Sequence, residues 1–89
     1  MTGAGGAAPA VTVFGRPGCH LCDDALVALE RIRADAPFEL RTVDIEQDER
    51  LLLAYLERIP VVVLDGEELY DHFVDERDLR ARLARVTGR

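Results

Sequence analysis

The chain has 89 residues, which is enough for one domain but not for two. Seventeen acidic residues against eleven arginines, with no lysine, give a formal net charge of −6, which argues against a nucleic-acid partner because such a partner requires a basic face. No apolar run approaches the roughly 20 residues that span a bilayer, and residues 1–10 have neither a basic nor an apolar signal region. We therefore expect a cytoplasmic protein without a membrane partner.

The first part of the chain predicts a tail, a strand and a helix. Residues 1–9 are rich in Gly and Ala without periodicity, so we expect a disordered tail followed by one domain over residues 10–89. Residues 10–14 form a β-branched run that is typical of a buried strand. After a short loop, residues 19–34 predict an amphipathic helix. Its apolar stripe consists of Cys22, Ala25, Leu26, Leu29 and Ile32.

A second strand and a second helix are predicted in the middle of the chain. Residues 38–43 read as a strand, and the acidic run at 44–48 suits a helix N-terminus. Apolar residues at helical spacing then predict a helix that continues up to Pro60. These residues are Leu52, Tyr55, Leu56 and Ile59.

The last part of the chain predicts a hairpin and a closing helix. Val61–Leu64 is an apolar strand, and Asp65 with Gly66 is the dipeptide favoured in a two-residue type I′ turn. Residues 67–73 form the returning strand. Asp75 can cap the final helix, with Val74 and Leu79 as a hydrophobic staple. The buried stripe of that helix is expected to be Leu79, Leu83 and Val86.

The predicted order is β-α-β-α-β-β-α, which places the chain in the α/β class. The strand–helix–strand unit makes the first two strands parallel with a right-handed crossover, and the tight turn makes the last two antiparallel. We expect one mixed four-stranded sheet, with the first and last helices on one face and the second helix on the other.

Two cysteines at the start of the first helix carry the candidate chemistry. Positions i and i+3 share a helix face, so the sulfurs of Cys19 and Cys22 can meet. Unpaired amides and the helix dipole stabilise a thiolate at Cys19, and Arg16 adds positive charge nearby. Cys22 lies one turn deeper on the apolar stripe. We therefore expect Cys19 to be the nucleophile and Cys22 the resolving thiol.

Three other interpretations of the cysteine pair remain open. A structural zinc site needs four ligands, and the only candidates are Cys19, Cys22, His20 and His72, of which His20 lies inside the cysteine pair in a poor geometry. Two inert buried cysteines fit poorly with a loop and helix start. An iron–sulfur cluster bridged between two chains would need ligands from outside this chain. A redox couple is favoured over all three, and no bound metal is expected.

At this point the chain resembles the glutaredoxin-like branch of the thioredoxin superfamily. The resemblance is carried by Arg-Pro-Gly-Cys-His-Leu-Cys at residues 16–22, by Ile59-Pro60 before an apolar strand, and by the order of elements. It implies a thioredoxin fold with a cis peptide bond between Ile59 and Pro60. It also implies that Ile59 offers its backbone to an extended substrate and that Arg16 binds a glutathione carboxylate.

Two departures from glutaredoxins stand beside this resemblance. His20-Leu21 replaces the usual Pro-Tyr between the cysteines, and residues 70–75 contain no Gly-Gly pair before the last helix. His20 can tune the couple, since a protonated imidazole stabilises a neighbouring thiolate.

From these observations we expect a small, monomeric thiol–disulfide oxidoreductase without a bound cofactor. Its substrates would be disulfides of proteins or small thiols. Its reductant would be glutathione, another low-molecular-weight thiol, or a reductase. The alternatives are a non-catalytic binding module of the same fold and a cluster-bridging dimer.

Overall fold

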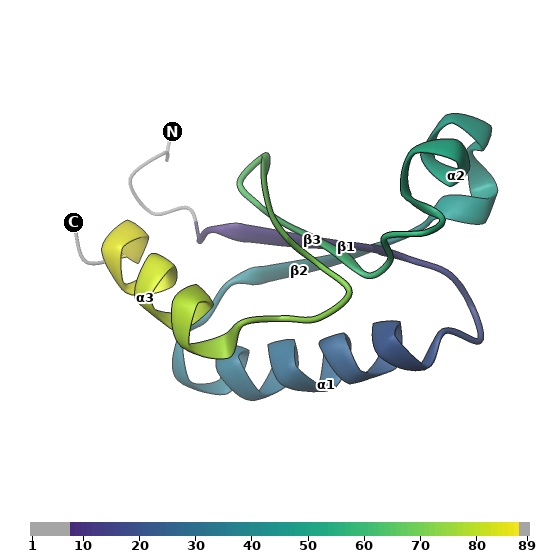
Figure 1. Cartoon of the computed structure of the whole chain (residues 1–89). Coiled ribbons are helices and arrows are strands. Elements are labelled where there is room, and N and C mark those ends of the chain that lie inside the picture. Colours follow the sequence, from purple (N-terminus) through teal and green to yellow (C-terminus); the bar gives the residue numbers. More distant parts are fainter. Residues whose placement is uncertain (1–7, 88–89) are drawn as a thin grey trace.

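The structure, a computed structural model, describes residues 8–87 and has the predicted element order with one added 3-10 turn (Figure 1). The elements are β1 (Ala10–Gly15), α1 (His20–Asp35), β2 (Glu39–Asp44), η2 (Ile45–Gln47), α2 (Glu49–Tyr55), β3 (Val61–Leu64), β4 (Glu67–Asp71) and α3 (Glu76–Thr87).

The four strands form one mixed sheet in the order β2-β1-β3-β4. β1 runs parallel to β2 and antiparallel to β3, and β3 is antiparallel to β4. This confirms the predicted thioredoxin-type topology, in which the first strand lies in the middle of the sheet.

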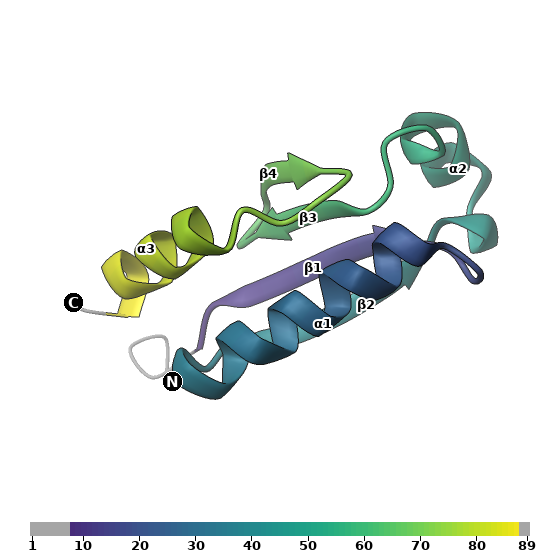
Figure 2. The same cartoon turned by 60° about the horizontal axis from the view of Figure 1, so that its bottom comes forward.

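The two long helices cover one face of the sheet, and α2 lies on the other side beyond its end (Figures 1 and 2). Apolar side chains from β1, β3, α1 and α3 form the main core between the helices and the sheet. They include Val11, Val13, Leu29, Ile32, Val62, Leu79 and Leu83, together with Phe38 from the loop before β2. On the opposite face Phe14 stacks against Tyr55, with ring centroids 4.9 Å apart.

The turn and cap predicted at the end of the chain are confirmed. Asp65 and Gly66 both have positive φ, at 48° and 89°, as a type I′ turn requires. The carboxylate of Asp75 accepts a hydrogen bond of 3.0 Å from the amide of Asp78, so it caps α3 as expected.

The bounds and burial of some elements differ from the predictions. α2 ends at Tyr55 rather than at Pro60, because Arg58 closes a turn onto Tyr55 and its carbonyl accepts from the amide of His72. None of the residues of α2 is fully buried. The acidic run caps two short elements rather than one, since Asp44 caps η2 and Asp48 caps α2.

The last two corrections concern the end of β4 and the last turn of α3. β4 stops at Asp71, where His72 adopts a left-handed backbone with φ of 70°. Val86 is 39% exposed and does not belong to the buried stripe, because α3 extends past the sheet there.

The predicted tail falls largely outside the described residues, which begin at residue 8. Pro9, which we had assigned to the tail, is buried, and its carbonyl accepts a hydrogen bond of 2.8 Å from the amide of Glu39. The packed part of the chain therefore includes Pro9. None of the helices within residues 8–87 is long and apolar enough to cross a membrane.

Candidate active site

The candidate site lies at one edge of the sheet, where the strands bring distant segments together. Phe14 and Val61 are paired neighbours on β1 and β3, and Val61 is paired with Asp71 on β4. β1 therefore ends beside the start of β3, and the loop to α1 leaves from the same edge. The residues that follow or precede these positions, including the cysteines and Ile59-Pro60, are brought to this edge by the strand register.

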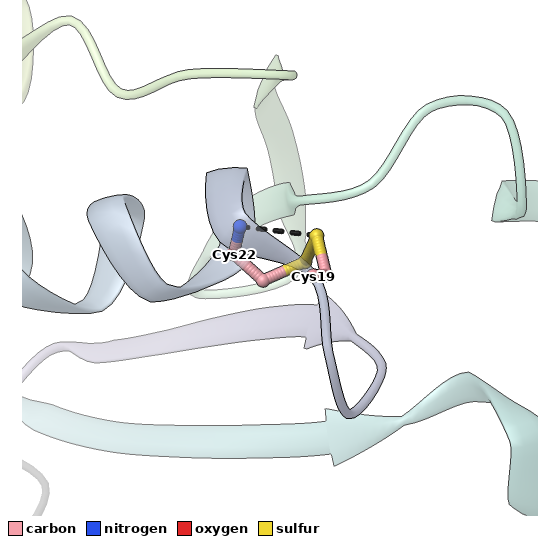
Figure 3. The surroundings of a disulfide bond; sticks show 2 residues. All are labelled: Cys19 and Cys22. Carbon is pink, nitrogen blue, oxygen red and sulfur yellow. Dashed lines mark hydrogen bonds between the residues drawn. A yellow bond between two sulfur atoms is a disulfide. The ribbon is translucent and has the colours of Figure 1, made fainter.

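Cys19 is the N-cap residue of α1. Its backbone is extended, with φ of −96° and ψ of 110°, and its sulfur accepts a hydrogen bond of 3.1 Å from the amide of Cys22 (Figure 3). The helix thus begins one residue later than predicted, because Cys19 fills the capping position. A sulfur in this position meets both the free amides and the positive end of the helix dipole, which stabilise a thiolate there.

Cys22 lies beneath Cys19 and is only 5% exposed. The two residues form a disulfide with Cα atoms 5.2 Å apart. Gly15 makes room for the buried sulfur, since a Cβ at this position would lie 2.9 Å from the Cys22 Sγ. Cys19 is the more exposed of the pair, which is the burial order that the two expected roles require.

Ile59 and Pro60 lead directly into β3, and the bond between them is cis, as the resemblance implied. Pro60 is buried and Ile59 is half-buried. His72 ties this segment to the end of β4, because its amide donates to the carbonyls of Arg58 and Pro60 at 3.2 and 2.9 Å. Its ring Nε2 lies 2.9 Å from the carbonyl oxygen of Glu57.

Arg16 and His20 occupy the loop and the first position of α1. The guanidinium of Arg16 forms an ion pair of 2.7 Å with Glu46 on η2, and His20 is exposed. The structure therefore brings five of the six predicted site residues to one edge of the sheet, where each has contacts described above, while His20 faces solvent. The five are Arg16, Cys19, Cys22, Ile59 and Pro60. Their roles in binding and catalysis stay predictions.

Two residues of this edge were not singled out for the site by the sequence. His72 entered only as a possible zinc ligand, and its left-handed backbone was not predicted, although histidine adopts a positive φ more often than most residues. Glu46 was part of an acidic run, and its pairing with Arg16 depends on a turn that was not predicted. Within residues 8–87 no three His, Cys, Asp or Glu side chains are grouped as ligands of a metal ion.

Comparison with known proteins gives the relationship that the motif suggested. Residues 10–84 match the family model described as Glutaredoxin-like domain (DUF836). The chain belongs to this glutaredoxin-like family. Its relatives include uncharacterized proteins of Mycobacterium tuberculosis and Mycobacterium bovis, each 33% identical over 84 residues, which is 89% of this chain and 87% of theirs.

Solved structures show that the glutaredoxin-like chain shares its fold with further bacterial proteins and with thioredoxins. A Nitrosomonas europaea protein has a TM-score of 0.77 at 30% identity, covering 92% of this chain and 98% of that one. A structural-genomics target from X. campestris has a TM-score of 0.70 at 38% identity, covering 84% and 96%. A mutant thioredoxin from Halobacterium salinarum has a TM-score of 0.66 at 21% identity, covering 91% and 76%, and indicates the fold alone.

Proposed function

We propose that this glutaredoxin-like protein is a thiol–disulfide oxidoreductase that reduces disulfides through Cys19 and Cys22. The observation that carries the proposal is the arrangement of the pair. One sulfur caps a helix and accepts an amide hydrogen bond, and the other is buried beside it within bonding distance. Such a pair provides an activated nucleophile and an adjacent resolving thiol.

The reaction proceeds in two exchanges. The Cys19 thiolate attacks one sulfur of the substrate disulfide, which breaks that bond, forms a mixed disulfide and releases the first substrate thiolate. The Cys22 thiol loses its proton and attacks the Cys19 sulfur, which forms the Cys19–Cys22 disulfide and releases the second thiolate. Two electrons pass to the substrate, and the two released thiolates take up the two protons that the cysteines gave up. A low-molecular-weight thiol such as glutathione, or a protein reductase, returns the pair to the dithiol.

The segment around Ile59 and Pro60 is the proposed place for the substrate backbone. Ile59 is half-buried and directly precedes β3, at the sheet edge from which the loop to Cys19 departs. His72 holds this segment from the β4 side through its amide and its ring. An extended substrate would lie across the Ile59 backbone while its disulfide faces Cys19.

The test is to trap the mixed disulfide. The reduced Cys22→Ser variant is mixed with hydroxyethyl disulfide, a small uncharged probe, and analysed by mass spectrometry. We expect one adduct on Cys19 that dithiothreitol releases. The Cys19→Ser variant, which keeps a single buried thiol, is the matched control and should form no adduct.

The same variant reports the kind of reductant. If a small thiol resolves the mixed disulfide, Cys22→Ser keeps partial turnover with that thiol, whereas with a protein reductase turnover vanishes. Equal adduct formation by both variants would contradict the assigned roles. If the reduced wild-type protein does not react with hydroxyethyl disulfide or other disulfides, the alternative of a non-catalytic binding module is favoured. If the purified protein is brown, an iron–sulfur cluster bridging two chains is favoured.

A further inference from the structure

Two arginines that flank the cysteine pair in the sequence, Arg16 and Arg31, already form ion pairs with carboxylates of this chain. Arg16 pairs with Glu46 at 2.7 Å, and Arg31 pairs with Glu76 at 2.7 Å in a two-bond arrangement. A substrate carboxylate that approached either guanidinium would have to displace an existing partner.

Arg58, the arginine nearest to Ile59 in the chain, forms ion pairs with two carboxylates. It forms a close ion pair with Glu68 and a second one of 3.2 Å with Asp71. Its guanidinium also lies over the ring of Tyr55, 5.5 Å from the centroid. Two carboxylates and the Tyr55 ring therefore already occupy the Arg58 guanidinium, so an anionic ligand would have to displace one of them.

Two carboxylates beside the cysteines, by contrast, have no cationic partner among residues 8–87. Asp23 and Asp24 directly follow Cys22 in the first turns of α1, and both are exposed. The amide of Asp23 bonds to the carbonyl of Cys19 at 3.1 Å, which fixes this turn close to the reacting sulfur. Asp23 and Asp24 thus place unpaired negative charge next to the disulfide, which repels anions and attracts cations.

A partly apolar groove begins next to the pair. It has a volume of about 290 Å³ and lies between α1 and the segment that joins β4 to α3. Leu21, the residue between His20 and Cys22, and Phe73 line it and are 48% and 66% exposed. Asp24 lines the same groove, so apolar surface and an unpaired negative charge are adjacent there.

We infer that the site selects disulfides on polypeptide segments with a bulky apolar residue and a basic residue near the cysteine, and that it discriminates against the glutathione anion. This inference rests on the proposed function. The apolar side chain would pack between Leu21 and Phe73. The basic side chain would meet Asp24, whereas glutathione, with two carboxylates against one ammonium, finds no free guanidinium among the three described above.

The charge component is tested with three small disulfides that differ in charge. Reduced wild-type protein reacts with cystamine, hydroxyethyl disulfide or oxidised glutathione, and each rate is divided by the rate of the same disulfide with dithiothreitol. At low salt we expect the normalised rate with cystamine to exceed the normalised rate with oxidised glutathione by about tenfold or more. In 1 M salt, where the Debye length falls to about 3 Å, the ratio should shrink to about threefold or less.

Variants assign this selectivity to the site. Asp24→Asn should lower the cystamine-to-glutathione ratio about twofold, while Glu67→Gln, which removes an exposed carboxylate at the far end of the β3–β4 hairpin, should leave it unchanged.

The apolar component is tested with two disulfide-linked peptides that share an Arg and place either Phe or Ser beside the cysteine. Phe73→Ala should slow the Phe peptide about three- to tenfold and leave the Ser peptide and cystamine unaffected. Val86→Ala, a surface truncation near the C-terminal end of α3, is the control and should change neither rate.

The outcomes separate this inference from the proposed function. Oxidised glutathione reacting as fast as cystamine, or a Phe peptide insensitive to Phe73→Ala, would overturn the inference while leaving the oxidoreductase intact. A dithiol form that is inert toward all three small disulfides, the uncharged one included, would overturn the proposed function and this inference with it.

Discussion

The amide nitrogen of Cys22 lies 3.1 Å from the sulfur of Cys19, so the buried cysteine donates a hydrogen bond to the exposed one. The bond joins the N-cap side chain of α1 to the third residue of the helix. It gives the two sulfurs different surroundings although they are only three positions apart, because one faces amides and solvent and the other faces the packed interior.

This asymmetry predicts the order in which the reduced cysteines are alkylated. With limiting iodoacetamide at mildly acidic pH, Cys19 should be modified first, since its thiolate is stabilised by the amide and is accessible. Peptide mapping by mass spectrometry reports the order directly. Modification of Cys22 before Cys19 would show that the attacking and resolving roles are reversed.

Gly15 predicts a packing constraint beneath the pair. In Gly15→Ala the new methyl group would lie 2.9 Å from the sulfur and 3.3 Å from the Cβ of Cys22, so either α1 or β1 must shift. We expect a loss of about 1–3 kcal/mol in unfolding free energy, as for other overpacked sites. Urea unfolding measures it. Gly18→Ala is the control for crowding, because its methyl would meet nothing within 4 Å and only the positive φ of 78° opposes it. A Gly15→Ala protein as stable as wild type would contradict this account.

The turn between β3 and β4 predicts a backbone effect at Gly66. Its φ of 89° lies in a region that β-branched residues avoid, and no atom crowds the position, so any cost of substitution comes from the backbone. Gly66→Val should lose about 1–2 kcal/mol, and Gly66→Asn, which tolerates a left-handed backbone, should lose clearly less. Denaturant midpoints of the two variants test the difference, and equal midpoints would refute it.

His72 predicts a local effect on the segment that carries Pro60. His72→Asn accepts the positive φ of 70°, but its shorter side chain cannot reach the carbonyl of Glu57. We expect a loss of about 0.5–1.5 kcal/mol and faster amide exchange over residues 57–60, measured by hydrogen–deuterium exchange. His20→Asn is the matched control, because His20 is exposed and without a hydrogen-bond partner among the described residues. Unchanged amide exchange over residues 57–60 in His72→Asn would show that the His72 side chain does not stabilise this segment.

Asp78 predicts a dependence of stability on acid. A hydrogen bond of 2.7 Å from the Tyr70 hydroxyl, and then one from Arg82, hold the pKa of Asp78 below its usual value. Because the folded pKa is the lower one, this carboxylate stabilises the fold above about pH 4 and loses that effect as the pH falls further. Asp78→Asn should therefore be less stable than wild type at pH 7, with a difference that narrows below about pH 4. Tyr70→Phe removes the same hydrogen bond, so its difference in unfolding free energy from wild type should also narrow below about pH 4. A difference that does not change with pH in either variant would contradict the role of Asp78.

Local signals in the sequence were sufficient for the order of the helices and strands and for the cysteine pair. The turn at Asp65 and Gly66, the cap at Asp75 and the N-terminal position of Cys19 each depend on a few neighbouring residues, and the structure has all three. A strand–helix–strand order with one tight hairpin then leaves few ways to assemble a four-stranded sheet.

What the sequence could not supply depends on contacts between distant segments. Periodicity marked Val86 as part of the buried stripe of the last helix, yet it is 39% exposed, because α3 extends past the sheet there (Figure 1). The partners of Arg16 and Arg58 are equally long-range, since they come from η2 and from β4. The sequence alone therefore could not predict that these arginines form ion pairs, because their partners are brought close only by the folded chain.

Both outer strands of the sheet are poor templates for another chain. On β4, Glu68 and Tyr70 pair with consecutive residues of β3, which leaves Leu69 as an extra residue and bends the strand. On β2, exposed Glu39 and Arg41 form an ion pair of 2.9 Å along the outer strand. Irregular and charged edges of this kind hinder edge-to-edge polymerisation. Growth of ribbon-like aggregates through backbone pairing of β2 or β4 is thus disfavoured.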